Sequence, residues 1–266
     1  MKRLCWLPFL LLGCTDSVVA ADPPPSTSSG SAETSAGTSS SSSSEATSSS
    51  SSGADASSSS SGELLDGPGC GIVPTCEERT VVGNVGVRSI EDLAQLQGAS
   101  EITGTLEVAD SDLECLDALA CLRIVGGDVR VLGNPALRST AGLGSVEELG
   151  ASDLNTARGS VVLSGNDTLE VLEGFEALDR VRGGITLWQN ASLREVAAFG
   201  GLRRLELLSI NGNPVLESLS GLHDLEQLED CNVNGNPDLC LSEIFEVCGD
   251  VDPPAGGVTA NNDDEC

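Results

Sequence analysis

The apolar residues in the second half of the chain recur with a step of three. Residues 210–228 read INGNPVLESLSGLHDLEQL, with leucine at 216, 219, 222, 225 and 228. An amphipathic α-helix repeats its apolar residues every 3.6 positions, and a half-buried strand alternates with a period of two. The step of three therefore predicts neither element, but a compact coil of short extended and turn segments.

The same step recurs in neighbouring segments, each counted from an asparagine or aspartate. At +3, +6, +9, +12 and +15 from these origins every residue is apolar except Thr140. The origins are Asp110, Asn134, Asn166, Asn190 and Asn213. Asn236 begins a further copy, and Asn84 and Asn262 fit more loosely at the two ends. This recurrence predicts a repeat architecture.

Immediately before each asparagine the period changes to two, as in DVRVLGN (128–134) and GITLWQN (184–190). Alternating apolar residues predict a short strand with one buried face. Each copy is then a strand, an asparagine turn and a coil. Because one copy cannot bury its inner face alone, we expect neighbouring copies to stack into a solenoid.

The recurring asparagines are expected to form a ladder inside the solenoid, where their amides pair with backbone groups that a tight interior corner leaves unpaired. The ladder residues are Asn134, Asn166, Asn190, Asn213 and Asn236. Two of them open N-glycosylation sequons, 166–168 and 190–192. We favour the structural role over glycosylation at both.

Two further repeat positions carry side chains of interest. Phe175, Phe199 and Phe245 share the +9 position, so we expect them to form one buried stack. The only histidine, His223, falls between leucines at +9 and +12 and is expected to face solvent.

The repeat resembles a known family. Ordinary leucine-rich repeats read LxxLxLxxNxL, whereas here Leu205xxLeu208xIle210xxAsn213 is followed by leucine at +3 rather than +2. The pattern GGxVxVxxNPxLxSxxGLxxL instead resembles the receptor L domain of insulin- and EGF-receptor ectodomains and fungal cell-wall proteins, over about residues 76–266. This resemblance implies a mainly β fold, a right-handed parallel β-helix or leucine-rich solenoid with short capping helices and disulfide-closed ends. A shared fold transfers no activity by itself.

The cysteines of residues 70–266 are even in number, which in an exported chain predicts disulfides. Cys240 and Cys266 each lie four residues after a ladder position, so we predict that they pair across neighbouring copies. That leaves Cys231 to pair with Cys248. At the start, the local pairs would be Cys70–Cys76 and Cys115–Cys121, with exchange among these four as the alternative.

Both ends of the solenoid carry candidate capping helices. Residues 89–98 read SIEDLAQLQG, with Ser89 and Asp92 placed as a capping box. Residues 241–248, LSEIFEVC, are the candidate at the other end. Between Asn134 and Asn166 the spacing is 32 residues, which predicts an insertion near 150–159 that loops out at the surface, as a recognition loop or as a tolerated insertion.

The N-terminus has the pattern of an exported protein. Residues 1–13 carry two basic residues and a short apolar run, as in a signal peptide. Leu11-Leu12-Gly13-Cys14 resembles the lipobox of bacterial lipoproteins, which implies lipidation of Cys14 and anchoring at the cell envelope, with Thr15 favouring the outer membrane. The alternative is cleavage near Ala20 or Ala21 and secretion. Residues 14–69 are Ser-rich and predict a disordered tether to a solenoid over 70–266.

Charge and motifs narrow the function classes. The net charge is −28 and no basic patch is found, which argues against nucleic-acid binding. No GxSxG, HExxH, P-loop or dinucleotide motif occurs, so we expect no enzyme activity and no cofactor. With one histidine and no C-x-x-C pair, we also expect no metal site. A hydrolase using paired acidic residues is a remote alternative.

The alternate residues of the strands would form an open sheet face, and the register places Trp188 outward. An exposed Trp188 flanked by Leu132 and Val162 is a candidate contact cluster, unless the inserted segment covers it. The candidate ligand-binding residues are Trp188, Arg130, Leu132, Val162, Thr186, Ser209 and Asn211. The sequence thus predicts a noncatalytic surface module that binds an unidentified protein or glycan, with a structural envelope protein lacking a discrete ligand as the alternative.

Overall fold

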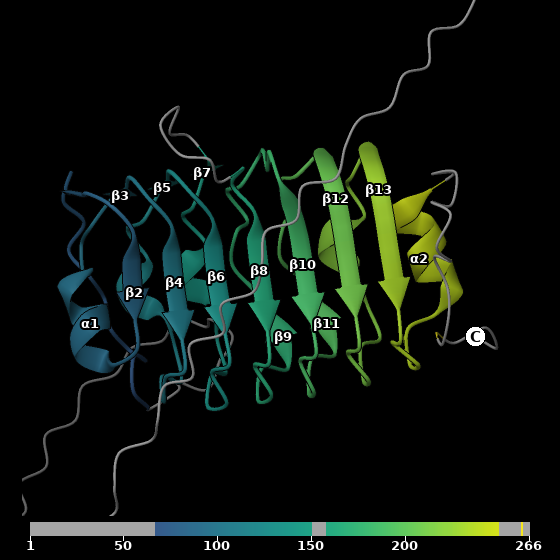
Figure 1. Cartoon of the computed structure of the whole chain (residues 1–266), viewed down its shortest axis with the longest axis horizontal. Coiled ribbons are helices and arrows are strands. Elements are labelled where there is room, and N and C mark those ends of the chain that lie inside the picture. Colours follow the sequence, from purple (N-terminus) through teal and green to yellow (C-terminus); the bar gives the residue numbers. More distant parts are fainter. Residues whose placement is uncertain (1–66, 151–157, 250–261, 263–266) are drawn as a thin grey trace, which may run out of the picture. The chain divides into compact units, whose positions relative to one another are not determined.

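A computed structural model describes residues 67–150, 158–249 and 262. All of these belong to one compact unit, Ser59–Cys266, and the other unit, Met1–Ser58, lies outside the described residues. The described part is a mainly β, parallel β-solenoid of about six turns, as the repeat predicted (Figure 1). The predicted signal peptide, Cys14 and nearly all of the predicted tether lie outside the described residues, as do residues 151–157 of the insertion.

One wall of the solenoid is a seven-stranded sheet in which every neighbouring pair is parallel, and we call it the strand wall. Its strands are β2 (Val85–Val87), β4 (Leu106–Ala109), β6 (Val129–Leu132), β8 (Val161–Ser164), β10 (Gly184–Trp188), β12 (Arg204–Asn211) and β13 (Gln227–Asn234). Each turn contributes one strand, so the order along the sheet follows the order along the chain. The predicted period-two segments form β6, β8, β10 and β12.

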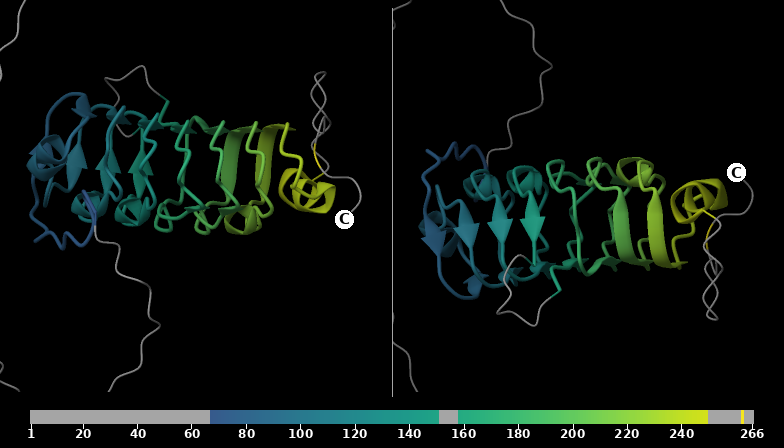
Figure 2. Two further views of the ribbon diagram at one scale, coloured as in Figure 1. Left: turned by 90° about the horizontal axis from the view of Figure 1, so that it is seen from below. Right: turned by 90° about the horizontal axis from the view of Figure 1, so that it is seen from above.

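The remaining walls consist of very short elements (Figure 2). A four-stranded sheet contains β1 (Thr80–Val81), β3 (Glu101–Ile102), β5 (Ile124–Val125) and β7 (Glu148–Leu149), and a two-stranded sheet contains β9 (Val171–Leu172) and β11 (Glu195–Val196). The 3-10 helices are η1 (Asp117–Leu119), η2 (Ala141–Leu143) and η3 (Ser220–Leu222). A 3-10 helix has three residues per turn. The coil of short strands and 3-10 turns therefore accounts for the apolar step of three.

The step-of-three residues form the core as predicted. They are buried in every copy except at the last two positions of the opening stretch, where Leu225 and Leu228 are partly buried. The one polar member, Thr140, is also fully buried, and its Oγ1 donates a hydrogen bond to the Glu173 carbonyl at 2.8 Å. The Phe175 and Phe199 rings stack with their centroids 5.3 Å apart.

Phe245 was expected to join this stack, and that prediction is wrong: its exposed fraction is 59%. After Asn236 the chain forms the helix α2 (Leu241–Cys248) instead of another coil. A helix turns its buried face every 3.6 residues, so Ile244 and Val247 face the solenoid and Phe245 points outward. The prediction of 241–248 as a terminal cap is confirmed.

The asparagine ladder is confirmed, with all five predicted members fully buried. In Asn190, Nδ2 donates to the Leu163 carbonyl at 3.4 Å and to Asn213 Oδ1 at 3.1 Å. Its Oδ1 accepts from the backbone N–H and the Nδ2 of Asn166, at 3.1 and 3.2 Å. Among the described residues, no buried side-chain nitrogen or oxygen lacks a hydrogen-bond partner. The two sequon asparagines therefore have structural partners for their amides.

The ladder differs from expectation at its ends. Asn262 continues it, since its Oδ1 accepts from Asn236 N–H at 3.1 Å. At the other end Asp110 is not a member. Ser111 takes the position, and its N–H and hydroxyl donate to Asn134 Oδ1 at 3.1 and 2.7 Å. The first coil is one residue shorter than the others, so counting back from the leucines reached Asp110, which is exposed.

At the N-terminal end, α1 (Ile90–Gln95) is the predicted cap. Ser89 Oγ accepts from Asp92 N–H at 3.2 Å, while the Asp92 carboxylate accepts from Arg88 N–H at 3.0 Å. This is the predicted capping box, with the return bond displaced by one residue. In the described residues no helix has both the length and the apolar character to cross a membrane.

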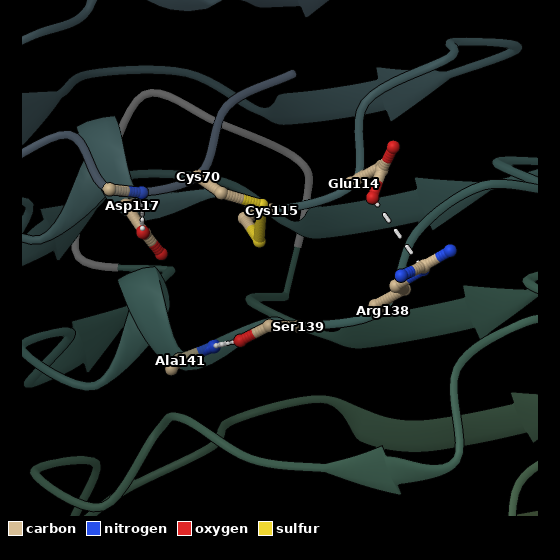
Figure 3. The surroundings of a disulfide bond; sticks show 8 residues. Cys70, Glu114, Cys115, Asp117, Arg138, Ser139 and Ala141 are labelled. Carbon is tan, nitrogen blue, oxygen red and sulfur yellow. Dashed lines mark hydrogen bonds and ion pairs between the residues drawn. A yellow bond between two sulfur atoms is a disulfide. The ribbon is translucent and has the colours of Figure 1, made fainter. Parts of the chain in front are cut away.

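The disulfides at this end follow the exchange alternative: the bonds are Cys70–Cys115 and Cys76–Cys121, and the local pairs were wrong. The segment before α1 lies alongside the next coil, and the Cys70–Cys115 bond lies close to Asp117 (Figure 3). Asp117 accepts from Gly71 N–H at 2.8 Å, and Glu114 N–H donates to the Pro68 carbonyl at 2.8 Å. Cys70 and Cys76 are six residues apart, and so are Cys115 and Cys121. When the two segments lie side by side, Cys70 therefore meets Cys115 and Cys76 meets Cys121.

At the C-terminal end the Cys231–Cys248 bond is confirmed, and it joins β13 to α2. Cys240 is disulfide-bonded. Its predicted partner Cys266 lies outside the described residues, so that pairing stays a prediction.

Candidate functional site

The strand wall brings the seven predicted binding residues to its outer face in two neighbouring rows. The first row aligns Arg130, Val162, Thr186 and Ser209. The second row aligns Leu132, Ser164, Trp188 and Asn211. The alternate residues of the same strands are buried, so the rows face away from the core.

Trp188 was expected either to be exposed or to be covered by another segment. It is exposed, with an exposed fraction of 51%. It is the last residue of β10, and its backbone is held on both sides. Its carbonyl accepts from Gly165 N–H at 3.2 Å, and Gln189 N–H donates to the Asn211 carbonyl at 3.0 Å. The adjoining ladder residue Asn190 is fully buried. A rigid backbone thus presents a half-exposed indole.

The neighbours of Trp188 differ in part from expectation. In its own row it lies between Ser164 and Asn211, and Leu132 is two strands away, about 10 Å along the sheet. A Cβ placed on Gly212 would lie 4.0 Å from the indole Cδ1, so the ring lies beside the turn after β12. The immediate surroundings of the indole are therefore more polar than a cluster with Leu132 and Val162.

From β8 to β13 the two rows carry no charge, and we call these residues the neutral patch. They are Val162, Ser164, Thr186, Trp188, Ser209, Asn211, Asn232 and Asn234. The whole chain has 41 acidic residues and a net charge of −28. An uncharged run over four neighbouring strands therefore stands out on this surface.

The polar groups of the neutral patch are hydroxyls and amides. Asn211 Nδ2 donates to Ser209 Oγ at 2.8 Å, and Asn234 is hydrogen-bonded to Asn232 in the same way one strand further on. Each of these hydrogen bonds joins two outward residues of the same strand. Groups of this kind recognise a ligand by hydrogen bonding.

Arg130 lies at the border of the neutral patch and is tied to its own strand. Its guanidinium binds Asp128 at 2.8 Å, and the Asp128 carboxylate also accepts from Ser160 N–H at 3.0 Å. Glu107 lies beside Arg130 in the first row. In these two rows, charged residues therefore occur on β4 and β6 and not on the strands from β8 to β13.

Leu207 was missed by the sequence prediction. It is a partly exposed leucine on the same face, two residues before Ser209, and it lies beside Gly184 in the register. The short alternating segment did not reveal it, because the alternation of β12 breaks upstream, where Glu206 and Leu207 are both exposed. β12 and β13 are eight residues long, whereas β8 has four.

One group of described side chains has metal-ligating composition and spacing: His223, Glu243 and Glu246. His223 follows η3 and the two glutamates belong to α2, so the group is not part of the strand wall.

No family model matches this chain, and no curated protein or solved structure matches it.

Proposed function

We propose that this chain is a noncatalytic surface module that binds a protein or glycan on the strand wall, through Trp188 and the neutral patch. The observation that carries the proposal is a half-exposed indole within an uncharged row of amides and hydroxyls on a strongly acidic protein. Tryptophan is enriched among residues that dominate binding energy. Its apolar ring packs on a partner while neighbouring polar groups fix the orientation.

The rigidity of the strand wall supports this role. Trp188 follows the buried Leu187 and lies two residues before the hydrogen-bonded ladder residue Asn190, and Asn211 has the same place before Asn213. A surface that is already ordered loses little conformational entropy on binding. The neutral patch is therefore suited to recognition without rearrangement.

The cellular setting of the proposal comes from the sequence. The receptor L-domain-like repeat favours a display module, and the lipobox-like residues 11–14 favour a lipid at Cys14 on the cell envelope. Thr15 favours the outer membrane, and the Ser-rich tether would serve as the spacer. Mass spectrometry of the mature N-terminus tests the anchor. A diacylated or triacylated Cys14 is expected, and an unmodified start after Ala20 or Ala21 would reject it.

Binding of the full chain to intact native cells tests the recognition surface. Trp188→Ala is expected to weaken saturable binding about 30-fold, corresponding to the roughly 2 kcal/mol of a hot-spot residue. Phe245→Ala is the matched control, because it removes a similarly exposed aromatic ring from α2. Unchanged binding by Trp188→Ala would reject the site.

Two treatments of the cells separate the ligand classes. Loss of binding after protease treatment identifies a protein, and loss after periodate oxidation identifies a glycan. The structural alternative predicts a different result: no saturable binding at all, together with impaired envelope integrity when the protein is deleted.

A further inference from the structure

The single histidine of the chain lies against two glutamates of the C-terminal helix. His223 follows η3, and its Nε2 lies 3.2 Å from Glu243 Oε2 while its Nδ1 lies 3.7 Å from Glu246 Oε1. Taking one ligand atom from each residue, all three atoms lie within 4.8 Å of one another. The imidazole was expected to be merely solvated, but it lies between two carboxylates.

The solenoid step explains how residues 20 and 23 positions apart meet. His223 stands ten residues after the ladder residue Asn213, and Glu246 stands ten residues after Asn236. They therefore occupy the same repeat position in neighbouring turns. Glu243 and Glu246 are three residues apart on α2, so both lie on one face of the helix.

One carboxylate of the group is held in place by the backbone. Glu243 Oε2 accepts a hydrogen bond from Leu219 N–H at 3.0 Å, and its side chain is three-quarters buried. Outer hydrogen bonds of this kind orient ligating side chains. Glu246 is more exposed, with 59% of its side chain accessible, so its carboxylate has room to move toward a shared ion.

We propose that His223, Glu243 and Glu246 bind one divalent transition-metal ion of the zinc class. An imidazole nitrogen with carboxylate oxygens suits zinc and its neighbours, whereas calcium and magnesium prefer sites made only of oxygen. Ligands about 2.1 Å from a tetrahedral ion are about 3.4 Å from one another, so the widest pair must approach by at most about 1.4 Å. The exposed Glu246 can supply that movement, and one or more water molecules would complete the coordination.

Such an ion would link the last turn to its cap. His223 belongs to one turn and both glutamates belong to α2, so a shared ion crosses the boundary between them. A ligand that binds only the folded chain raises its unfolding temperature. The proposal is independent of the neutral patch, because neither Trp188 nor its row contributes a ligand.

Isothermal titration of the chelator-treated full chain with zinc chloride tests the site, with cobalt absorption spectra reporting nitrogen and oxygen ligation. One equivalent per chain is expected, together with a higher unfolding temperature. His223→Gln and Glu246→Gln should each weaken zinc binding at least tenfold. Glu229→Gln, which removes an exposed carboxylate from β13, should leave it unchanged.

Two results would overturn the proposal. One is zinc binding that is unchanged in both His223→Gln and Glu246→Gln. The other is calcium binding as tight as zinc binding at the same stoichiometry, which would leave no role for the imidazole. Thermal unfolding of the metal-free variants checks that each is folded, and in a folded variant a loss of binding reports the site itself.

Discussion

Phe199 and Phe245 occupy the same repeat position, nine residues after their ladder asparagines, yet one is fully buried and the other is 59% exposed. Phe199 belongs to a middle turn, where it stacks on Phe175. Phe245 belongs to the last turn, which ends in α2. The two residues thus compare the middle of the solenoid with its end.

The difference follows from what each position packs against. In the turns that begin at Asn134, Asn166 and Asn190, all step-of-three residues are buried. The turn that begins at Asn236 ends in α2, a helix that caps the described solenoid. A helix turns other residues toward the core than the coil does, so Ile244 and Val247 are buried and Phe245 is exposed.

The largest effect is expected from Asn190→Ala in the middle of the ladder. It removes the Asn190 acceptor of the Asn166 backbone N–H and the Asn190 donor to the Leu163 carbonyl, while Asn166 Nδ2 keeps only its bond to the Val131 carbonyl. A buried polar group without a partner costs about 1–3 kcal/mol, so the free energy of unfolding should fall by about 5 kcal/mol. Urea unfolding followed by circular dichroism measures it.

The same substitution at the end of the ladder sharpens the comparison. Asn262 is only partly buried, and water can replace its contacts to Asn236. Asn262→Ala should therefore lower the free energy of unfolding by about 1 kcal/mol. Equal losses for the two variants would show that the ladder is not more important in the middle turns.

The next effect compares the two phenylalanines directly. Phe199→Ala opens a cavity beside Phe175 and should lower the free energy of unfolding by about 4 kcal/mol. Phe245→Ala removes an exposed ring from a helix and should change it by less than about 0.5 kcal/mol. Paired thermal and urea unfolding checks both values, and similar losses would mean that Phe245 is packed after all.

The middle turns were predictable from the sequence because one rule holds in all of them. The step of three marks the buried coil, the period of two marks the strands, and each ladder asparagine repeats beside the same partners. The outward position of Trp188 follows from the same alternation. Its polar neighbours Ser164 and Asn211 follow from the register between strands, once the turns are aligned by their asparagines.

The ends were less predictable because the rule changes there. Counting in threes placed Phe245 inside. Residues 241–248 also fit a helix, and the repeat count does not distinguish a helix from a further coil at this end. It began the first copy at Asp110 instead of Ser111, because the first coil is shorter by one residue. The disulfide pairing depends on how residues 67–76 lie along the next coil, and the contacts of His223 depend on how α2 packs. Both are tertiary arrangements that no local pattern encodes.

The smallest effect concerns a surface link between neighbouring turns. Arg123 Nε and an η nitrogen donate to the two carboxylate oxygens of Glu147, at 2.9 and 2.8 Å, and both side chains are exposed. The hydrogen bond from Arg123 lowers the pKa of Glu147, and its positive charge adds to this against the opposing effect of desolvation. Because the folded-state pKa is lowered, the pair stabilises the fold above the unfolded pKa, and this contribution is lost as the pH falls through the folded pKa.

Arg123→Gln should therefore raise the Glu147 pKa toward its ordinary value, measured by NMR titration of the carboxyl group, with little change in stability at neutral pH. Arg194→Gln, which removes the similar pair with Glu217, should leave the Glu147 pKa unchanged. If Glu147 kept its lowered pKa in Arg123→Gln, the contact with Arg123 would not be the cause of that lowered pKa.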